Sequence, residues 1–426
     1  MNCKKSIFGI LDNKNARLLL LYSIICGIFF TVPKLKFVLY IIIILSIIFS
    51  IYKGPIYLYT IYTISNIYIG ELFPASFVIL YQLLIICIFF LYNQKMIKKF
   101  KKSVLFIIAL SIIIVSYLLG YKSDINSTIQ MVVCLLMVII LMNSNQSFNE
   151  KNISLCIWSY FCSAISLLCY FIFQFISGTI VFKYGRLSFI GDIKTVSTIV
   201  AIPIILLISA KLENKRVFDH VDFEYFDNIL LTLFIGILIL TAARGVILSI
   251  LVAILFQLIF TKNKPVAYRR IIPIIILAIG IILISFNNES LRIERIFASE
   301  EYSSGGGRTG IWITYFSIIC NSGISHILFG MGPGEISRIS TIGYYAHSTF
   351  LDFFFSYGLF GFILIVYVEL QLLKMAMKKK NMTIMALFIS QILMFFTHGS
   401  SANVFLFSFQ TILYLKLKKD RSIAIC

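Results

Sequence analysis

The dominant pattern along this chain is a series of apolar blocks separated by short polar or basic segments. Most blocks run for about 16–25 residues, the length that a helix needs to cross the hydrocarbon core of a bilayer. A backbone inside a membrane must satisfy its own hydrogen bonds, so we expect these blocks to be helices. They are too long, and alternate too little, for the strands of an outer-membrane barrel.

The pattern predicts an all-α, polytopic membrane bundle of about fourteen spans, in one domain that covers residues 1–426. No second soluble domain and no internal repeat is evident. One large loop, at about 287–347, interrupts the last third. The third span is the least typical, because it is short and rich in tyrosine. The expected spans are 17–33, 36–52, 55–70, 73–92, 103–121, 127–142, 153–177, 194–210, 229–243, 246–261, 270–286, 348–373, 382–398 and 403–416.

Composition supports the membrane class. Hydrophobic residues make up 60% of the chain and charged residues only 13%, against about 25% charged in soluble domains. The first apolar run lacks a small-residue cleavage site, so we expect a retained helix rather than a signal peptide. Most of the nine cysteines lie inside apolar blocks. For this reason we expect no disulfide framework. The sequence also has no Cys/His spacing typical of zinc, and it predicts no metal and no cofactor.

The charge excess, 37 Lys+Arg against 18 Asp+Glu, sets the orientation. We exclude nucleic acid as a partner because the lysines gather at the ends of apolar blocks. With both termini in the cytoplasm, the basic clusters fall inside, as the positive-inside rule requires, and Lys34 and Lys36 are the clearest exceptions. Such clusters also attract anionic lipid headgroups. They are Lys98 to Lys102, Lys211 to Arg216, Lys262 to Arg270, Lys374 to Lys380 and Lys416 to Arg421.

The large loop falls on the external side and contains no lysine. After Arg308, apolar residues recur at helical spacing, which predicts an amphipathic helix over 311–319 on or near the membrane surface. The segment Gly330–Gly334 follows and is rich in turn residues. It lacks the Lys-Ser/Thr ending of a phosphate loop, so it predicts a turn. His347 then opens the next span.

Four residues on the external side could carry chemistry. Arg186, Arg244, Arg308 and His347 all fall at the depth of the membrane surface in the predicted topology. Guanidinium groups bind phosphate through paired hydrogen bonds, and imidazole is the base best suited to neutral pH. This set predicts a site for a lipid-linked phosphate or pyrophosphate.

Each of these residues also has a purely structural interpretation. An arginine at a helix end can be a membrane-surface anchor, and a histidine there can be an ordinary helix-end residue. Asp352 lies about one turn inside the span, where it either orients His347 or bonds a neighbouring helix. Ser348 is a second candidate supporting residue.

The ordered set of motifs over roughly the last 250 residues resembles the bacterial O-antigen polymerase and O-antigen ligase superfamily. Many members have His-Asn where this chain has His347-Ser348, and serine keeps a hydrogen-bonding side chain. The motifs are Tyr184-Gly185-Arg186-Leu187-Ser188-Phe189, Thr241-Ala242-Ala243-Arg244-Gly245, Arg308-Thr309-Gly310-Ile311-Trp312, Leu328 to Gly334, His347-Ser348, and Gly358-Leu359-Phe360-Gly361.

The resemblance implies a multi-pass glycosyltransferase of the bacterial inner membrane, independent of metals, with its active site on the periplasmic side. Its donor is expected to be an oligosaccharide on undecaprenyl pyrophosphate. The family's arginines correspond to Arg186, Arg244 and Arg308, which would bind the pyrophosphate. His347 would act as the catalytic base, with Arg308 beside it.

The resemblance leaves the acceptor open. The spacing from His347-Ser348 over nine residues to Gly358 and Gly361 is also described for ligases. Polymerases carry a similar His-x-x-x-Leu-Asp stretch, which His347 to Asp352 fits better. We therefore favour a polymerase, for which a chain-length regulator protein is a candidate partner. A ligase, which would transfer the glycan to lipid A-core, is the alternative. A transporter of the same lipid-linked oligosaccharide is a further alternative. Transporters typically have charged or broken helices near the membrane centre and an internal repeat, whereas the apolar blocks here hold few central charges and no repeat. A non-enzymatic scaffold leaves the external arginines unexplained.

Overall fold

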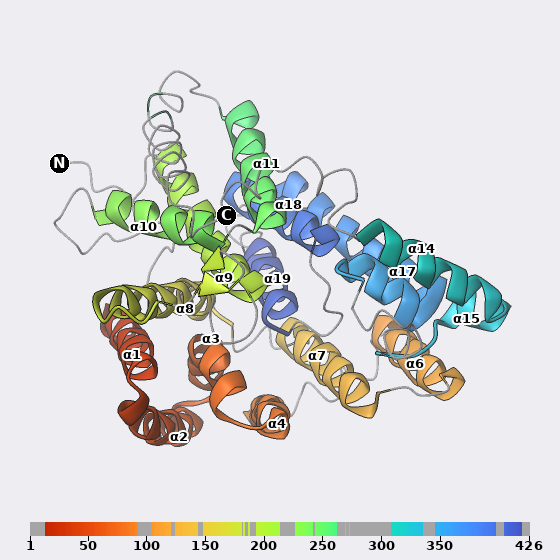
Figure 1. The fold of residues 1–426 in the computed structure, drawn as a ribbon, viewed down its shortest axis with the longest axis horizontal. Coiled ribbons are helices and arrows are strands. Elements are labelled where there is room, and N and C mark those ends of the chain that lie inside the picture. The colour runs from red at the N-terminus through yellow and green to blue at the C-terminus, as the bar shows by residue number, and fades with distance from the viewer. Residues whose placement is uncertain are drawn as a thin grey trace.

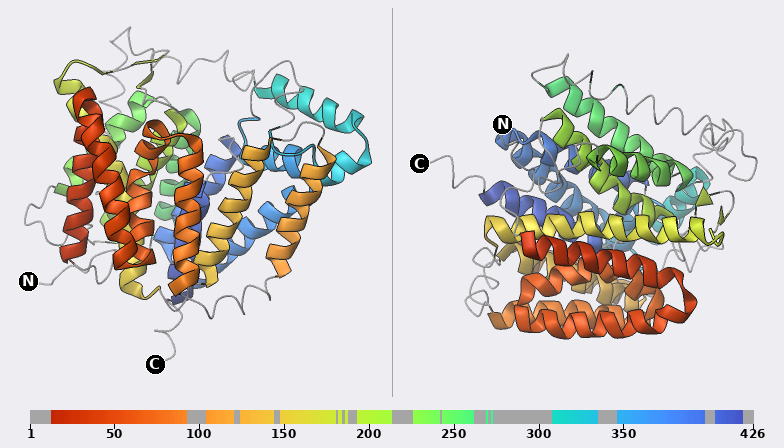
Figure 2. Two further views of the ribbon diagram at one scale, coloured as in Figure 1. Left: turned by 90° about the horizontal axis from the view of Figure 1, so that it is seen from below. Right: turned by 90° about the vertical axis from the view of Figure 1, so that its left-hand side faces the viewer.

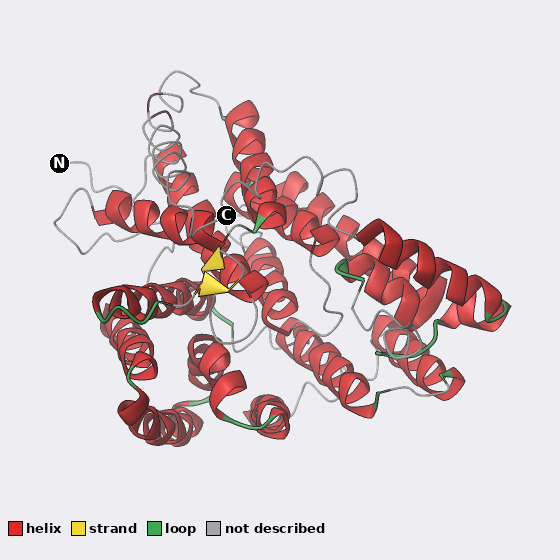
Figure 3. Cartoon of the chain, viewed as in Figure 1, coloured by secondary structure: helices red, strands yellow, loops and turns green. Residues whose placement is uncertain are grey.

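The chain folds into a bundle of α-helices, with one short antiparallel strand pair in the part that the structure describes (Figure 3). In the strand pair, Phe182 lies opposite Leu187 and Lys183 lies opposite Arg186. The computed structural model describes residues 13–92, 104–120, 124–143, 148–180, 182–183, 186–187, 193–213, 226–241, 243–261, 269, 272, 308–334, 346–397 and 404–419.

Figure 1 shows the arrangement of these elements. In chain order they are α1 (Asn13–Thr31), the 3-10 helix η1 (Pro33–Leu35), α2 (Lys36–Lys53), α3 (Pro55–Leu72), α4 (Ala75–Tyr92), α6 (Val104–Leu119), α7 (Ile125–Asn143), α8 (Glu150–Ile176), β1 (Phe182–Lys183), β2 (Arg186–Leu187), α9 (Ile193–Leu212), α10 (Phe226–Thr241), α11 (Arg244–Phe260), α14 (Arg308–Asn321), α15 (Ile324–Phe329), α17 (Thr349–Lys379), α18 (Met382–Thr397) and α19 (Val404–Lys419).

Helices occupy the positions of the expected spans, except that the span expected at 270–286 lies almost wholly outside the described residues. The all-helical class is therefore confirmed, while the total of fourteen spans stays a prediction. In the expected loop 287–347, the described residues include α14 and α15. Within the described part of the chain, six helices are long and apolar enough to cross a membrane, namely Lys14–Thr31, Pro33–Lys53, Ile125–Met142, Glu150–Ile176, Thr195–Leu212 and Thr349–Lys379.

Helix α8 forms the centre of the bundle, where it packs against α1, α3, α9 and α19 and is buried along nearly its whole length. Helix α2 lies at the periphery and buries only one stripe. Its Leu39, Ile43 and Ile47 recur every four residues and face the core, as one face of an α-helix does. Ile44 and Ile48 on the other side are exposed. An apolar outer face of this kind suits contact with hydrocarbon.

The tyrosine-rich third span is a well-packed helix, α3. The Tyr59 hydroxyl lies 2.5 Å from the Tyr160 hydroxyl of α8, and the Tyr68 hydroxyl lies 2.7 Å from the Ser166 hydroxyl. All four side chains are buried. Because a buried hydroxyl needs a hydrogen-bond partner, these pairs explain how an unusually polar segment can lie inside the bundle.

The two ends of the bundle differ. In the left view of Figure 2 the helices run roughly side by side, and α14 and α15 lie across one end. The strand pair of β1 and β2 lies at this same end, whereas α19 finishes at the opposite end. The strand pair that contains Arg186 and the helix that begins with Arg308 therefore lie at one end of the molecule.

Candidate functional site

His347 lies in the short loop that leads into α17, and its backbone has the left-handed conformation. Its φ is 55°, and Lys380 is the only other described non-glycine residue with a positive φ. This conformation costs a residue with a side chain about 1–2 kcal/mol, so surrounding contacts must hold it in place. The side chain is half-buried.

Two hydrogen bonds to Ala346 hold the loop immediately before His347. The indole N–H of Trp312 in α14 donates to the carbonyl oxygen of Ala346 at 2.7 Å. The backbone N–H of Ala346 donates to Oδ1 of Asp352 at 3.1 Å. Ala346 itself is buried. The residue that precedes the histidine is therefore clamped between α14 and the first turn of α17.

Ser348 fixes the other side of His347. It is the N-cap of α17, and its hydroxyl accepts a long hydrogen bond from the N–H of Leu351 at 3.5 Å. The same hydroxyl donates to the carbonyl oxygen of Phe395 in α18 at 3.5 Å. The prediction left two roles open for Asp352. The structure adds a third, because its Oδ1 accepts the hydrogen bond from the N–H of Ala346 and so holds the loop backbone.

Helix α14 is attached to α17 by an apolar face. Tyr315 and Ile319 are fully buried, and the rings of Tyr315 and Phe355 meet edge to face with their centroids 5.3 Å apart. The helix predicted over 311–319 is confirmed. Its packing places the start of α14, which is Arg308, on the same rigid unit as the loop of His347.

The glycine-rich turn after α15 contacts the backbone of α17. Helix α17 departs from helical geometry at Gly358, where φ is 66° and ψ is −164°. The carbonyl oxygen of Phe355 accepts from the N–H of Met331 at 3.0 Å, and that of Ser356 accepts from the N–H of Gly332 at 3.1 Å. The break in α17 thus supplies the acceptors that hold the turn.

The same turn is attached to α6 and α7. The Ser116 hydroxyl of α6 donates to the carbonyl oxygen of Phe329. The N–H of Asp124, which precedes α7, donates to the carbonyl oxygen of Pro333 at 3.0 Å. The turn predicted at Gly330–Gly334 is confirmed, and the backbone from Phe329 to Pro333 connects α6, α7 and α17.

Arg244 lies level with Ser348 along the bundle. The Ser249 hydroxyl of α11 and the Ser390 hydroxyl of α18 are 3.2 Å apart. Arg244 precedes Ser249 by five residues, and Phe395 follows Ser390 by five. Because the two helices run antiparallel with the same rise per residue, Arg244 and Phe395 lie at one height. The Phe395 carbonyl is the one that Ser348 contacts.

Arg244 and Arg308 each stand at the start of a helix. Arg244 begins α11 and Arg308 begins α14, and both side chains are half-buried. The first turn of a helix carries free N–H groups and a partial positive charge. A cation there is unfavourable by itself, whereas an anion is stabilised by the N–H groups and the guanidinium together. The arrangement suits the binding of phosphate groups.

Arg186 lies at the same end of the bundle, in the strand pair. Its backbone pairs with Lys183 in the strand pair, and β2 contacts α10. Helix α10 ends at Thr241, three residues before Arg244. The structure thus groups Arg244, Arg308 and His347 around α11, α14, α17 and α18, and places Arg186 beside α10.

The sequence interpretation missed Trp312 as a functional neighbour. It counted this residue in an apolar stripe and in a family motif, without a partner. A signal was available, because the indole N–H of a partly buried tryptophan needs an acceptor. The partner, Ala346, lies 34 residues away and has no sequence feature that marks it.

Fold and site together define a polytopic helical membrane protein that presents arginines and a histidine at one end of its bundle. Residues 229–366 match the family described as O-Antigen ligase. The match includes Arg244, Arg308, His347 and Asp352 and leaves Arg186 outside. It confirms the resemblance to the O-antigen ligase and polymerase superfamily, whose members are glycosyltransferase-like membrane enzymes of polysaccharide biosynthesis. Among curated proteins no match to the chain was found.

Proposed function

We propose that the protein is an O-antigen polymerase of the bacterial inner membrane, with its active site on the periplasmic side. It would move the growing glycan from undecaprenyl pyrophosphate onto a lipid-linked repeat unit. The hydrogen bond from Trp312 to Ala346 carries this proposal. It ties the helix that begins with Arg308 to the loop of His347, so that a phosphate-binding cation and a base share one rigid framework, as positioning for transfer requires.

The chemistry follows from the side chains. His347 removes the proton from the acceptor hydroxyl. The freed oxygen attacks the anomeric carbon of the donor sugar, the bond from that carbon to the pyrophosphate oxygen breaks, and the configuration inverts. Undecaprenyl pyrophosphate leaves with an added negative charge. Arg308, Arg244 and Arg186 stabilise that charge through paired hydrogen bonds.

The backbone around His347 supports the role of base. A left-handed residue held by contacts on both sides is typical of functional sites, where the surrounding structure maintains an unfavourable conformation. Asp352 and Trp312 fix Ala346, and Ser348 starts α17. The imidazole is thus presented from a loop whose position is determined by two helices.

A ligase is the second candidate, and the description of the matched family favours it. Both enzymes would use the same donor and the same base. They differ in the acceptor, which is a lipid-linked repeat for the polymerase and lipid A-core for the ligase. The spacing from His347 to Asp352, which resembles that of polymerases, places the polymerase first.

The test is a gel of lipopolysaccharide from a strain that lacks the gene, with and without the gene restored. A core capped with one repeat, with the ladder returned on restoration, supports the polymerase. Bare core together with accumulated lipid-linked polymer indicates the ligase. Bare core without any periplasmic polymer would contradict both and indicate transport.

A further inference from the structure

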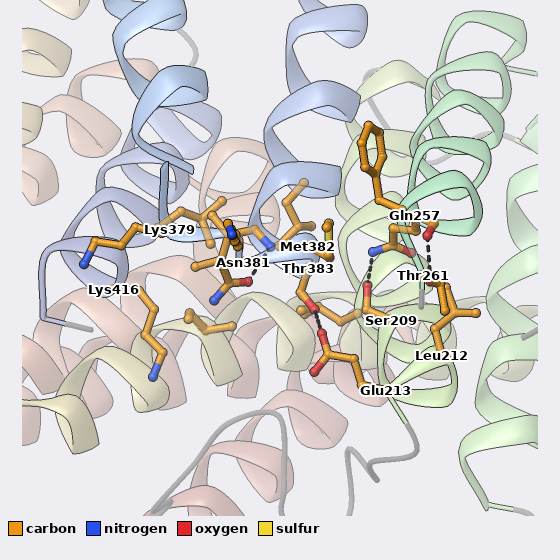
Figure 4. A pocket seen from close by; sticks show the side chains of 17 residues that line it. Ser209, Leu212, Glu213, Gln257, Thr261, Lys379, Asn381, Met382, Thr383 and Lys416 are labelled. Carbon is orange, nitrogen blue, oxygen red and sulfur yellow. Dashed lines mark hydrogen bonds between the residues drawn. The ribbon is translucent and has the colours of Figure 1, made fainter. Parts of the chain in front are cut away.

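A cavity of about 600 Å³ lies at the end of the helices opposite to His347. Helix α17 starts beside His347 and runs to Lys379, which lines this cavity. The ends of α9, α11 and α19 and the start of α18 complete the wall (Figure 4). The cavity is therefore separate from the candidate catalytic site by the length of a helix.

The charged residues that line the cavity give it a positive excess. The lining includes three lysines, Lys379, Lys380 and Lys416, and one carboxylate, that of Glu213. Figure 4 shows Lys379 and Lys416 on one side of the cavity. Oε1 of Glu213 accepts a hydrogen bond from the Thr383 hydroxyl at 2.8 Å. Three ammonium groups against one carboxylate that already accepts a hydrogen bond favour an anionic ligand.

The deeper part of the cavity contains a buried acceptor. Gln257 is 2% exposed, and its amide nitrogen donates to the hydroxyl of Ser209. Its Oε1 has no hydrogen-bond partner among the described residues. A buried acceptor without a partner is unfavourable, so a hydroxyl or a water that enters with a ligand would stabilise it. The space is thus suited to an occupant rather than to closure by side chains.

The remaining wall is mainly apolar and includes Leu212, Phe260, Leu387 and Leu413. Phe260 is half exposed at the end of α11. Inorganic phosphate alone would leave this apolar surface without a partner. A phospholipid satisfies both parts, because its phosphate can contact the lysines while its acyl chains follow the apolar wall.

We propose that this cavity binds an anionic phospholipid, with its phosphate at Lys379, Lys380 and Lys416 and its acyl chains along the wall that includes Phe260. In the predicted topology this end faces the cytoplasm, where anionic lipids give the leaflet its negative surface potential. The proposal is independent of the transferase activity, because it concerns lipid binding by the purified protein.

The experiment is native mass spectrometry of the full-length protein in detergent, titrated with phosphatidylglycerol, phosphatidylethanolamine or inorganic phosphate. The test variant is Lys379→Gln/Lys380→Gln/Lys416→Gln. The control is Lys374→Gln/Lys378→Gln/Lys418→Gln, which removes three lysines from the same two helices without touching the cavity lining. A third variant replaces the three cavity lysines by arginine and keeps the charge.

We expect one phosphatidylglycerol to bind the parent and control proteins and the arginine variant. The glutamine variant should bind about 100-fold more weakly, since each lysine near a phosphate strengthens lipid binding severalfold. Equal binding by the glutamine variant and its control would overturn the proposal. If phosphatidylethanolamine bound as tightly as phosphatidylglycerol, the cavity would not select an anionic headgroup, and the proposal would be wrong. Displacement of the lipid by millimolar phosphate would show a phosphate site instead. If the glutamine variant misfolds, loss of lipid by the arginine variant would contradict the proposal.

Discussion

Gly330 and Gly358 lie where two segments meet closely, and the backbone next to each glycine occupies the space that a side chain on the other would need. A Cβ on Gly330 would lie 2.3 Å from the carbonyl carbon of Ser356, and a Cβ on Gly358 would lie 2.3 Å from that of Leu328. Both glycines have a positive φ, 81° and 66° respectively. This contact holds the break in α17 against the turn that follows α15, and so helps to position α17, whose first turn follows His347.

Replacing Gly358 by alanine should disrupt that contact. The new methyl group meets backbone atoms that cannot move aside, and the positive φ adds strain, so we expect a loss of about 3 kcal/mol or more in stability. Thermal unfolding in detergent measures the effect. Gly236→Ala in α10 is the matched control, because a Cβ there meets nothing within 4 Å. Its unfolding temperature should be unchanged or slightly higher, and similar losses in both variants would contradict the packing role.

The bond from Trp312 to Ala346 predicts a specific effect on activity. Trp312→Phe removes the indole donor and leaves a buried carbonyl without its partner, which costs about 1–3 kcal/mol. Because this carbonyl precedes His347, we expect glycan transfer to fall about tenfold or more. Trp158→Phe is the control, since the indole of Trp158 donates to the carbonyl of Ala16 at 3.1 Å in another part of the bundle. Transfer that falls equally in both variants would indicate a general loss of stability.

Asp352 offers a test of how the loop is held. Asp352→Asn keeps an oxygen that can accept from the N–H of Ala346, whereas Asp352→Ala removes it. If the carboxylate serves as an acceptor for the loop, transfer should persist in the asparagine variant and fall strongly in the alanine variant. Loss of transfer in both variants, with normal membrane levels, would show that the negative charge itself is required. A gel of the polysaccharide ladder measures the difference.

Hydrophobic patterning predicted the helices well, because the length and composition of an apolar block depend on neighbours in sequence. It even placed α3 correctly, although the tyrosines of that helix find their partners on α8. The contacts that assemble the candidate site are of another kind. Gly330 meets Gly358, Trp312 meets Ala346, and Arg244 is level with Phe395. Each pair depends on how distant segments dock.

Such pairs could not be predicted from one sequence. A glycine suggests a positive φ or a close approach, but it does not name the partner. The arginines and His347 were selected by their chemistry and by the predicted topology, and the structure brings three of these residues to neighbouring helix ends. Arg186, chosen for the same reasons, lies in the strand pair beside α10, and its part in the site stays a prediction.

Arg308 is expected to require its guanidinium group. Arg308→Lys keeps the charge and the start of α14 but replaces a planar, two-pronged donor by a point charge. We expect transfer to fall about 10- to 100-fold, which corresponds to one lost charge-assisted hydrogen bond. Initial rates with a lipid-linked donor in detergent measure this. A lysine variant as active as the parent would show that Arg308 does not bind phosphate through paired contacts.

His347 allows the base and the backbone to be tested separately. His347→Ala removes the imidazole, but alanine also tolerates the left-handed conformation poorly. His347→Asn removes the base while keeping a residue that adopts this conformation more readily. Both variants should lose about 10²- to 10⁴-fold in transfer, the usual contribution of a general base, and both should insert normally. His326→Ala, a histidine truncation in α15, should leave transfer unchanged. If His347→Asn is active while His347→Ala is not, the residue serves the loop conformation, and the base must be another group.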